Sequence, residues 1–290
     1  MKLALGTAQF GSHYGAFNGA GRIAPEEVSQ ILREAIGAGI RTLDTALAYG
    51  DSERAIGASG LAGSFAIVTK IPSLRQVPDP ATRIQTLLSE SRGRLGVATV
   101  HGLLLHDPSD LLSPMGPSVW RAMKEARDSG QVSKIGVSVY DDEQAFSIVE
   151  HYDIDLVQLP VSIIDQRVVH SGLLKDLKAV GIEIHARSVF LQGFILAEPG
   201  SLPPQLRRFR DTLSFFRSWC RKAGYTPIEA ALAFVGQLPE VDRLVVGVDG
   251  LRHLEQIIGA YLDGPKLPAA WACASRDLDL VDPRRWPKIS

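Results

Sequence analysis

Residues 41–53 read Arg-Thr-Leu-Asp-Thr-Ala-Leu-Ala-Tyr-Gly-Asp-Ser-Glu, in which a short apolar strand ends on the carboxylate of Asp44. The next loop carries the phenol of Tyr49, and the Gly-Asp-Ser-Glu run predicts a helix that begins near Ser52, with Asp51 or Ser52 as its N-cap. In parallel α/β barrels, ionisable groups at the carboxyl ends of strands usually take part in chemistry, whereas groups at the opposite face serve stability. The stretch therefore predicts a strand, a loop and a helix, with reactive side chains on the loop.

Two later segments resemble this strand. Residues 65–70 form an apolar run that ends on Lys70, and residues 101–106 form another that ends on His106. Because parallel barrel strands present their carboxyl ends at one face, we expect Asp44, Tyr49, Lys70 and His106 to converge there.

Eight short apolar strands alternate with amphipathic helices along the chain. The strands are expected at residues 2–7, 41–44, 65–70, 101–106, 134–138, 155–158, 182–187 and 244–247. The helices are expected at residues 25–36, from residue 52, and at 79–95, 119–127, 143–151, 172–180, 206–223, 227–235 and 250–261. Continuous Val, Ile and Leu runs are typical of parallel strands covered by helices. The pattern predicts an α/β fold, a single-domain (β/α)8 TIM barrel over residues 1–290.

Residues 264–290 are expected to form a C-terminal extension of this barrel, because four prolines interrupt them. Trp271 and Trp286 are expected to pack against the barrel.

Composition argues against several classes of partner. The chain has 290 residues, with 31 Lys and Arg against 32 Asp and Glu, so no overall field attracts nucleic acid or an anionic membrane. No apolar run reaches membrane-spanning length, and the N-terminus does not resemble a secretory signal. Cys220 and Cys273 fit no metal or redox spacing and are interpreted as free thiols in a reducing compartment. We therefore expect a soluble, cytoplasmic protein.

A carboxylate, a phenol, a lysine and a histidine at neighbouring strand ends suggest acid catalysis on a carbonyl oxygen. A phenol has a pKa of about 10 and is a poor acid at neutral pH. A nearby lysine favours the phenolate and lowers that pKa, while a carboxylate beside the lysine keeps the ammonium charged. A histidine can hydrogen-bond the same substrate oxygen. Since none of these groups is a reductant, carbonyl reduction would need hydride from a nicotinamide.

Several motifs carry a resemblance to a known family. They are Leu-Gly-Thr at residues 5–7, Leu-Asp-Thr-Ala-x-x-Tyr-Gly-x-Ser-Glu at 43–53, Val-Thr-Lys at 68–70, Leu-Leu-Leu-His at 103–106, Lys-Ile-Gly-Val-Ser at 134–138 and Val-Gln at 157–158. With these motifs in this order, the sequence resembles the aldo-keto reductase superfamily, and its bacterial and potassium-channel-β-like branch more than the mammalian steroid and aldose reductases. The resemblance implies that Tyr49 is the proton donor, that Lys70 lowers its pKa, that Asp44 pairs with Lys70, and that His106 orients the substrate carbonyl.

The resemblance also implies a cofactor site. Ser138 and Gln158 match residues that hold the nicotinamide carboxamide, and Ser188 matches a pyrophosphate contact. Arg187 stands where the family often has an aromatic residue stacked on the nicotinamide; its positive charge there could attract an anionic substrate group. The cofactor-binding residues that we expect are Gly6, Thr7, Asp44, Ser138, Gln158, Arg187, Ser188, Gly247, Asp249, His253 and Gln256.

The segment at residues 247–256 matches the part of the family that binds the adenosine phosphate. Asp249 would repel a 2′-phosphate, whereas Arg252 and His253 can pair with it. On the family pattern NADP(H) is the favoured cofactor, and NAD(H) is the other candidate.

Other polar residues are given simpler interpretations. His101, His151, His170 and His185 are expected to be surface or supporting groups, and no cluster has metal-ligand spacing, so no metal is expected. His13 and Tyr14 are candidates for the border of the substrate cleft, and Asp107 is expected either to orient His106 or to cap a turn.

We predict an enzyme, an NAD(P)H-dependent reductase of an aldehyde, ketone or sugar carbonyl, with a small molecule as its partner. One alternative is a non-catalytic nicotinamide-binding regulatory subunit or redox sensor. Another is a barrel aldolase or isomerase with Lys70 as a Schiff-base nucleophile, against which the neighbouring Asp44 argues because a paired lysine stays protonated.

Overall fold

Eight parallel strands close into a barrel in the order β1-β2-β3-β4-β5-β6-β7-β8, which confirms the predicted (β/α)8 fold. The structure is a computed structural model, and it describes residues 1–264, 267 and 270–286. The strands are β1 Leu3–Gly6, β2 Thr42–Asp44, β3 Ala66–Ile71, β4 Val100–Leu105, β5 Val132–Ser138, β6 Leu156–Pro160, β7 Glu183–Arg187 and β8 Arg243–Gly247. Pairing of β1 with β8, in which Leu3 is opposite Leu244, completes the ring.

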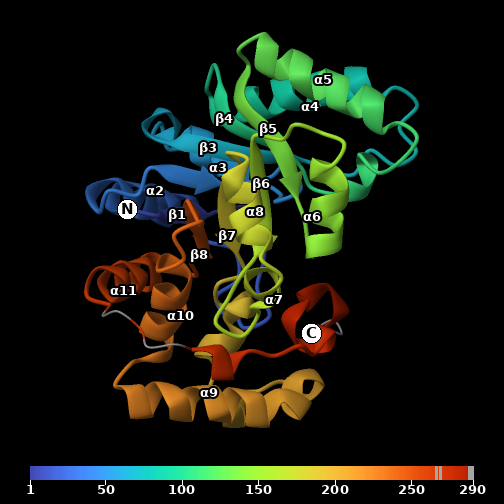
Figure 1. Ribbon diagram of the computed structural model, residues 1–290. Helices are drawn as coiled ribbons and strands as arrows, with labels where there is room; N and C mark the ends of the chain where they lie inside the picture. The colour runs from blue at the N-terminus through green and yellow to red at the C-terminus, as the bar shows by residue number, and fades with distance from the viewer. Residues whose placement is uncertain (265–266, 268–269, 287–290) are drawn as a thin grey trace.

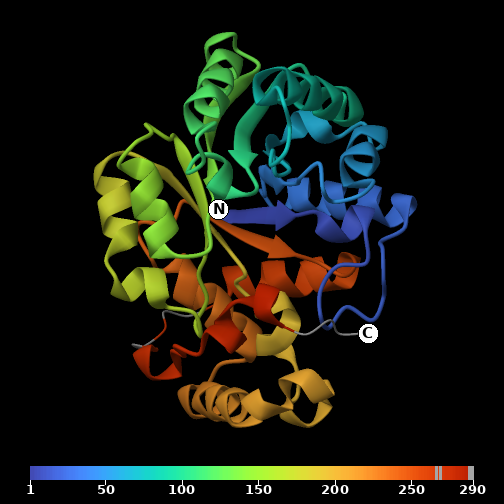
Figure 2. The same ribbon diagram turned by 90° about the vertical axis from the view of Figure 1, so that its right-hand side faces the viewer.

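Helices surround the barrel and cover the outer faces of its strands (Figures 1 and 2). They are α1 Ala8–Gly11, α2 Pro25–Gly37, α3 Ser52–Ala58, α4 Pro80–Leu95, α5 Gly116–Asp128, α6 Asp142–Val149, α7 Arg167–His170, α8 Leu173–Ala179, α9 Arg210–Ala223, α10 Pro227–Gly236, α11 Leu251–Leu262 and α12 Leu278–Val281. Apolar residues at helical spacing explain this arrangement. In α2, for example, Val28, Ile31, Leu32 and Ala35 are buried on one face.

Several predicted helix boundaries differ from the structure. Helix α5 begins three residues before the expected position, and the helix expected over residues 206–223 divides into a 3₁₀ segment, Pro204–Phe209, and α9. The four-residue helices α1 and α7 were not predicted, because so short a segment shows no readable period. Neither Asp51 nor Ser52 caps α3 with its side chain. Instead, the hydroxyl of Ser52 donates to the carbonyl of Thr7 at 2.8 Å.

The interior of the barrel has polar groups at both ends and an apolar layer between them. Val68, Leu104 and Leu156 form that layer and are fully buried. Below it, at the amino end of β7, Glu183 accepts hydrogen bonds from His185 at 2.7 Å and Lys134 at 2.5 Å. Burial opposes the ionised form of Glu183, but these hydrogen bonds and that of His101 outweigh it and hold the pKa of its carboxyl low.

Of the two interpretations of His185, the surface one is wrong and the supporting one agrees with the structure, because its side chain is fully buried inside the barrel and contacts Glu183. His101 is partly exposed at the edge of the same cluster, 3.3 Å from Glu183. Ionic groups at the amino ends of barrel strands usually contribute to stability. We therefore assign this cluster to the fold.

The C-terminal segment packs beside α9, on the same side of the barrel (Figures 1 and 2). It contains the 3₁₀ turns Trp271–Cys273 and Pro283–Arg285 with α12 between them. Trp286 is buried as expected, and its ring lies 6.2 Å from that of Phe194. The side chain of Trp271 lies outside the part of the chain that the structure describes.

Gly11 brings α1 into direct contact with the loop that carries Tyr49. A Cβ at residue 11 would lie 1.7 Å from the carbonyl oxygen of Tyr49 and 2.4 Å from the amide nitrogen of Ser52. On the other side of this contact, Gly50 adopts a φ of 56°, which glycine tolerates best. Because residue 11 has no side chain, α1 can lie directly against the loop that carries Tyr49, and this contact helps to position Tyr49 at the barrel mouth.

Gly11→Ala is expected to lower the free energy of unfolding by about 1–3 kcal/mol or more, because the added methyl must push backbone atoms apart. The measurement is urea unfolding followed by circular dichroism. Gly37→Ala at the end of α2 is the control, since a Cβ there meets nothing within 4 Å, and it should be neutral or stabilising. Equal effects of the two substitutions would contradict the proposed packing role of Gly11.

Candidate active site

Asp44 and Lys70 form a buried ion pair at the carboxyl ends of β2 and β3. Both carboxylate oxygens of Asp44 lie 2.7 Å from Nζ of Lys70, which also donates to the carbonyl of Thr45 at 2.9 Å. The Lys70 side chain has no exposed surface. Neighbouring parallel strands with this register bring the two residues together, as the sequence predicted.

Gln158 of β6 joins the ion pair from across the barrel. Its Nε2 donates to Oδ1 of Asp44 at 2.6 Å, so the carboxylate is held by an ammonium and an amide at once. Burial lowers the pKa of the Lys70 ammonium, and the adjacent carboxylate limits that fall. A buried charge without such partners would be strongly unfavourable.

Tyr49 lies directly above this pair. Nζ of Lys70 is 5.2 Å from the centroid of the Tyr49 ring, and the His106 ring meets that ring edge-on at 5.9 Å. All four predicted catalytic residues are thus brought together at one end of the barrel.

The expected lowering of the Tyr49 pKa by Lys70 is wrong for this structure. Burial of the phenol raises its pKa above the ordinary value, and the negative charge of Asp44 raises it further, while Arg187 acts in the opposite direction. The ammonium of Lys70 is balanced by Asp44 and so gives the phenol little net help. The Tyr49 hydroxyl is therefore protonated at neutral pH.

His106 is held as a neutral imidazole. Burial, with a contribution from the charge of Lys70, lowers its pKa to about 4. Asp107 does not orient it: its carboxylate accepts from the amide of Ser109 at 3.1 Å and caps the turn Pro108–Asp110. Of the two roles considered for Asp107, the structure therefore supports the cap.

A pocket extends from Tyr49 across the barrel mouth to the start of α11. The predicted residues that line it are Gly6, Thr7, Asp44, Tyr49, Gln158, Arg187, Ser188, Gly247, Asp249 and His253. Glycine at residues 6 and 247 keeps its floor free of side chains, and a Cβ at Gly247 would meet the side chain of Gln9 at 2.8 Å. The pocket thus joins the ends of β1, β2, β6 and β8 to the start of α11.

Two predicted cofactor residues do not line this pocket. Ser138 is buried at the end of β5, paired with Gln158 in the sheet. Gln256 is exposed on α11 and lies beside Thr226 and Glu229 of α10, at the outer surface. The position of Gln256 in the sequence of α11 predicted a contact with the cofactor. In the structure its side chain lies on the outer surface, so that prediction is wrong.

Of the two residues predicted to border the substrate cleft, the structure places Tyr14 in the pocket and not His13. The Tyr14 ring lies 6.3 Å from that of Tyr49, whereas His13 contacts the carbonyl of Asn18 at 2.7 Å. Lining residues that were not predicted are Ala8, Gln9, Gly15, Phe17, Asn18, Val189, Phe190, Gln192, Gly193, Leu196, Val245 and Val246. They come from α1, the first loop, the segment after β7 and β8, and only their meeting in space identifies them.

The segment after β7 has an unusual backbone. Ser188, Leu191 and Gln192 have positive φ angles of 60°, 46° and 52°, in the region that side chains other than glycine rarely adopt. Such conformations cluster at ligand-binding sites because the surrounding structure must hold them in place. The segment forms one wall of the pocket.

Asp249 and His253 lie close together at the far end of the pocket, where burial lowers the pKa of the imidazole. Asp249 lies 3.8 Å from Nδ1 of His253 and 3.5 Å from Nε2 of Gln9. Arg252, the next residue before His253, is exposed.

Among residues 1–264, 267 and 270–286, no group of three or more His, Cys, Asp or Glu side chains is placed to hold a metal ion. Within the same residues, no helix has the length and apolar character needed to cross a bilayer.

Comparison with known proteins agrees with this geometry. The model of the Aldo/keto reductase family matches residues 2–268. An aldo-keto reductase of Mycobacterium sp. (strain JLS) is 32% identical over 190 residues, which cover 62% of this chain and 65% of the relative. An aldo-keto reductase of Mycobacterium avium (strain 104) is 33% identical over 139 residues, 47% of each chain. The matched region thus spans about half to two-thirds of the length of these curated relatives.

A solved structure shows the same fold at low sequence identity. Aldo-keto reductase AKR11C1 from Bacillus halodurans, in its holo form, superposes with a TM-score of 0.73 at 18% identity, over 93% of this chain and 89% of that one. With the family model covering nearly the whole chain, this protein belongs to the aldo/keto reductase family.

Asp44→Asn is expected to cost about 3–5 kcal/mol of the free energy of unfolding, because it leaves a buried ammonium without its counter-charge. The double variant Asp44→Asn with Lys70→Met should recover much of that loss, since no buried charge then remains. Urea unfolding of the wild type and both variants measures this. A double variant less stable than Asp44→Asn would contradict the account of the ion pair.

His106 is expected to stay neutral at pH 6 in the folded protein, because its pKa is lowered to about 4. In the unfolded chain the same imidazole should titrate at about 6.5. Between these two values the unfolded state binds more protons, so His106 makes the protein less stable as the pH falls through this window. NMR titration of the imidazole, compared between the native protein and the protein in urea, tests this. A native titration near the unfolded value would refute the burial argument.

Proposed function

We propose that this protein is an oxidoreductase that reduces an aldehyde, ketone or sugar carbonyl to the alcohol with NAD(P)H. The observation that carries the proposal is the position of the Tyr49 phenol above the buried Asp44–Lys70 pair, with a neutral imidazole at its edge. Membership of the aldo/keto reductase family supports the same chemistry.

The nicotinamide, when bound, supplies the hydride, and the protein supplies the proton and the geometry. Tyr49 holds a proton on its hydroxyl and passes it to the carbonyl oxygen as negative charge develops there. Lys70 and Asp44 hold the phenol above a fixed ion pair, and the charge of Arg187 opposes the rise in the Tyr49 pKa, so it favours departure of the proton once the oxygen becomes basic. Neutral His106 can donate one hydrogen bond to the same oxygen, which orients the carbonyl.

The residues proposed to hold the cofactor form two groups along the pocket. Gln158 lines the pocket with Tyr49 and is suited to the nicotinamide carboxamide, together with Ser138, which is buried at the end of the neighbouring strand. Gly247, Asp249 and His253 are at the other end and are suited to the adenosine phosphate. NADP(H) is favoured over NAD(H) on the family pattern, with Arg252 as the cation for a 2′-phosphate and Asp249 opposing it. Burial lowers the pKa of His253, so its imidazole would pair with the phosphate through a hydrogen bond.

Tyr49→Phe is expected to lower kcat by roughly 100- to 10,000-fold, because it removes the proton donor and keeps the ring. The affinity for NADPH, measured by the change in fluorescence on binding, should be nearly unchanged. Tyr261→Phe is the matched control: its hydroxyl accepts only from the amide of Lys2 at the opposite end of the chain, at 3.1 Å. Retained turnover in Tyr49→Phe would refute its role as the donor.

The same assay separates a reductase from a nicotinamide-binding sensor. A panel of neutral aldehydes with NADPH or NADH, monitored at the nicotinamide absorbance, should show continuous oxidation of the cofactor by the wild-type protein. Tight binding of cofactor without such oxidation would favour the regulatory alternative.

A further inference from the structure

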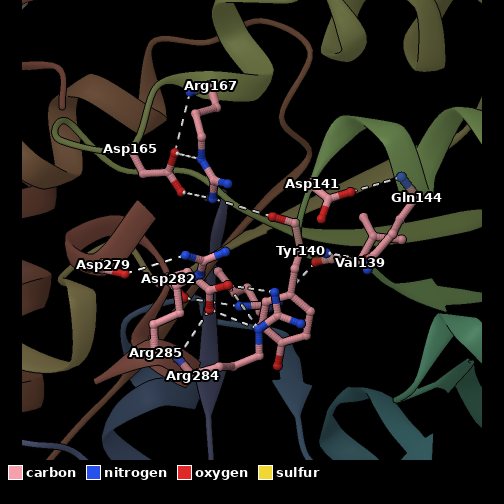
Figure 3. A network of polar contacts seen from close by, with 12 residues as sticks. Val139, Tyr140, Asp141, Gln144, Asp165, Arg167, Asp279, Asp282, Arg284 and Arg285 are labelled. Atoms are coloured by element: carbon pink, nitrogen blue, oxygen red, sulfur yellow. Dashed lines mark hydrogen bonds and ion pairs between the residues drawn. The ribbon is translucent and has the colours of Figure 1, made fainter. Parts of the chain in front are cut away.

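Tyr140, two residues after the end of β5, is enclosed by two arginines. The guanidinium carbon of Arg187 lies 4.2 Å from the centroid of its ring, and that of Arg284 lies 3.5 Å from it. Arg284 comes from the C-terminal turn Pro283–Arg285, and Figure 3 shows it packed against Tyr140. The C-terminal segment therefore contacts the same aromatic ring as a residue of the pocket.

The other arginines of this network are neutralised by carboxylates (Figure 3). Arg284 forms two-pronged contacts with Asp282, the shortest at 2.6 Å, and Arg167 does the same with Asp165 at 2.8 Å. Arg285 pairs with Asp279 at 3.4 Å. The charges of Arg284 and Arg167 are each balanced by one carboxylate, whereas Asp279 is shared between Arg285 and Arg208, the latter at 2.8 Å.

Arg187 is different, because no carboxylate pairs with it in the part of the chain that the structure describes. Its guanidinium donates to the carbonyl of Val139 at 2.9 Å and to the hydroxyl of Ser188 at 3.2 Å. A guanidinium has five N–H donors, so several remain for another group. Arg187 lines the same pocket as Tyr49 and Gln158. Its guanidinium is held there by hydrogen bonds, and no carboxylate of the described residues balances its charge.

The charge of Arg187 acts at the reacting end of the pocket. Although burial dominates the pKa of Tyr49 and raises it, Arg187 is the group that opposes that rise most strongly. The pKa of His106, lowered first by burial, is lowered a little more by Arg187. Asp44 cannot balance this cation, because it is already committed to Lys70 and Gln158.

We propose that the natural substrate carries a carboxylate or phosphate in addition to its carbonyl, and that Arg187 binds this anionic group. The inference rests on the proposed reductase function and names its substrate class. A planar guanidinium matches such oxyanions with two parallel hydrogen bonds. Stacking on Tyr140 orients the plane of Arg187 before substrate binds, which reduces the entropy cost of binding.

Tyr140 and Arg284 are positioning residues in this scheme. Arg284 packs over the same ring as Arg187, and its own charge is neutralised by Asp282. It therefore acts on the substrate through the ring. The C-terminal segment, which is remote from β7 in sequence, thereby contributes to the choice of substrate.

The test compares charged and neutral aldehydes of similar shape. The pairs are para-carboxybenzaldehyde with para-nitrobenzaldehyde, for a carboxylate, and glyceraldehyde phosphate with glyceraldehyde, for a phosphate. The quantity measured is the ratio of kcat/KM for the charged member to that for the neutral member, with NADPH saturating. The pair with the larger ratio identifies which of the two anions the site prefers.

In the wild type this ratio should exceed one for at least one pair. Arg187→Gln should lower it by roughly 10- to 100-fold, the size of a lost charge-assisted hydrogen bond. Arg187→Lys, which keeps the charge without the planar fork, should give an intermediate ratio. If Arg187 instead stacks only on the nicotinamide, both aldehydes of a pair will lose activity equally and the ratio will not change, which overturns the inference.

Arg284→Gln and Arg285→Gln form a matched pair at the C-terminus. Both side chains are about half exposed, but only Arg284 stacks on Tyr140. Arg284→Gln should lower the ratio, and Arg285→Gln should leave it unchanged. Equal ratios in the two variants would overturn the positioning role.

The outcomes also separate this inference from the function on which it rests. Turnover of neutral aldehydes with a ratio at or below one in the wild type overturns the anionic substrate alone. Absence of turnover with every aldehyde overturns the reductase function and the inference together.

Discussion

The candidate site depends on the pairing of a buried ammonium with a buried carboxylate, Lys70 with Asp44. Neither charge would be tolerated alone inside the barrel, because each would lose its hydration without compensation. Together with the amide of Gln158 they form a compact polar group that the barrel can enclose. Tyr49 rests on this group, so the position of the reactive phenol is set by electrostatics as much as by its loop.

This arrangement changes how the acidity of Tyr49 should be understood. A lysine that stands alone beside a phenol lowers the pKa of the phenol. Here the charge of Lys70 is already balanced by Asp44. Burial and Asp44 raise the pKa of Tyr49, so the resting phenol is protonated. In the proposed reaction, transfer of this proton would wait until the substrate oxygen gains negative charge.

The walls of the pocket come from segments whose backbones are unusual. Gly11 and Gly50 permit a close contact that holds the Tyr49 loop, and Ser188, Leu191 and Gln192 have positive φ angles in the segment after β7. The C-terminal segment adds Arg284, which reaches the pocket only through the ring of Tyr140. Strand ends thus supply the reactive groups, while loops and the C-terminal segment shape the space around them.

The order of elements and the convergence of Asp44, Tyr49, Lys70 and His106 could be predicted from local patterns, because strand runs and helical periods are short-range properties and parallel strands place their ends at one face. The boundaries of α5 and the position of Gln256 could not, since they depend on how each helix packs and rotates against the barrel. The pKa of Tyr49 depends on burial from all sides. The stacking of Arg187, Tyr140 and Arg284 joins residues from three distant parts of the chain, and only their meeting in space defines it.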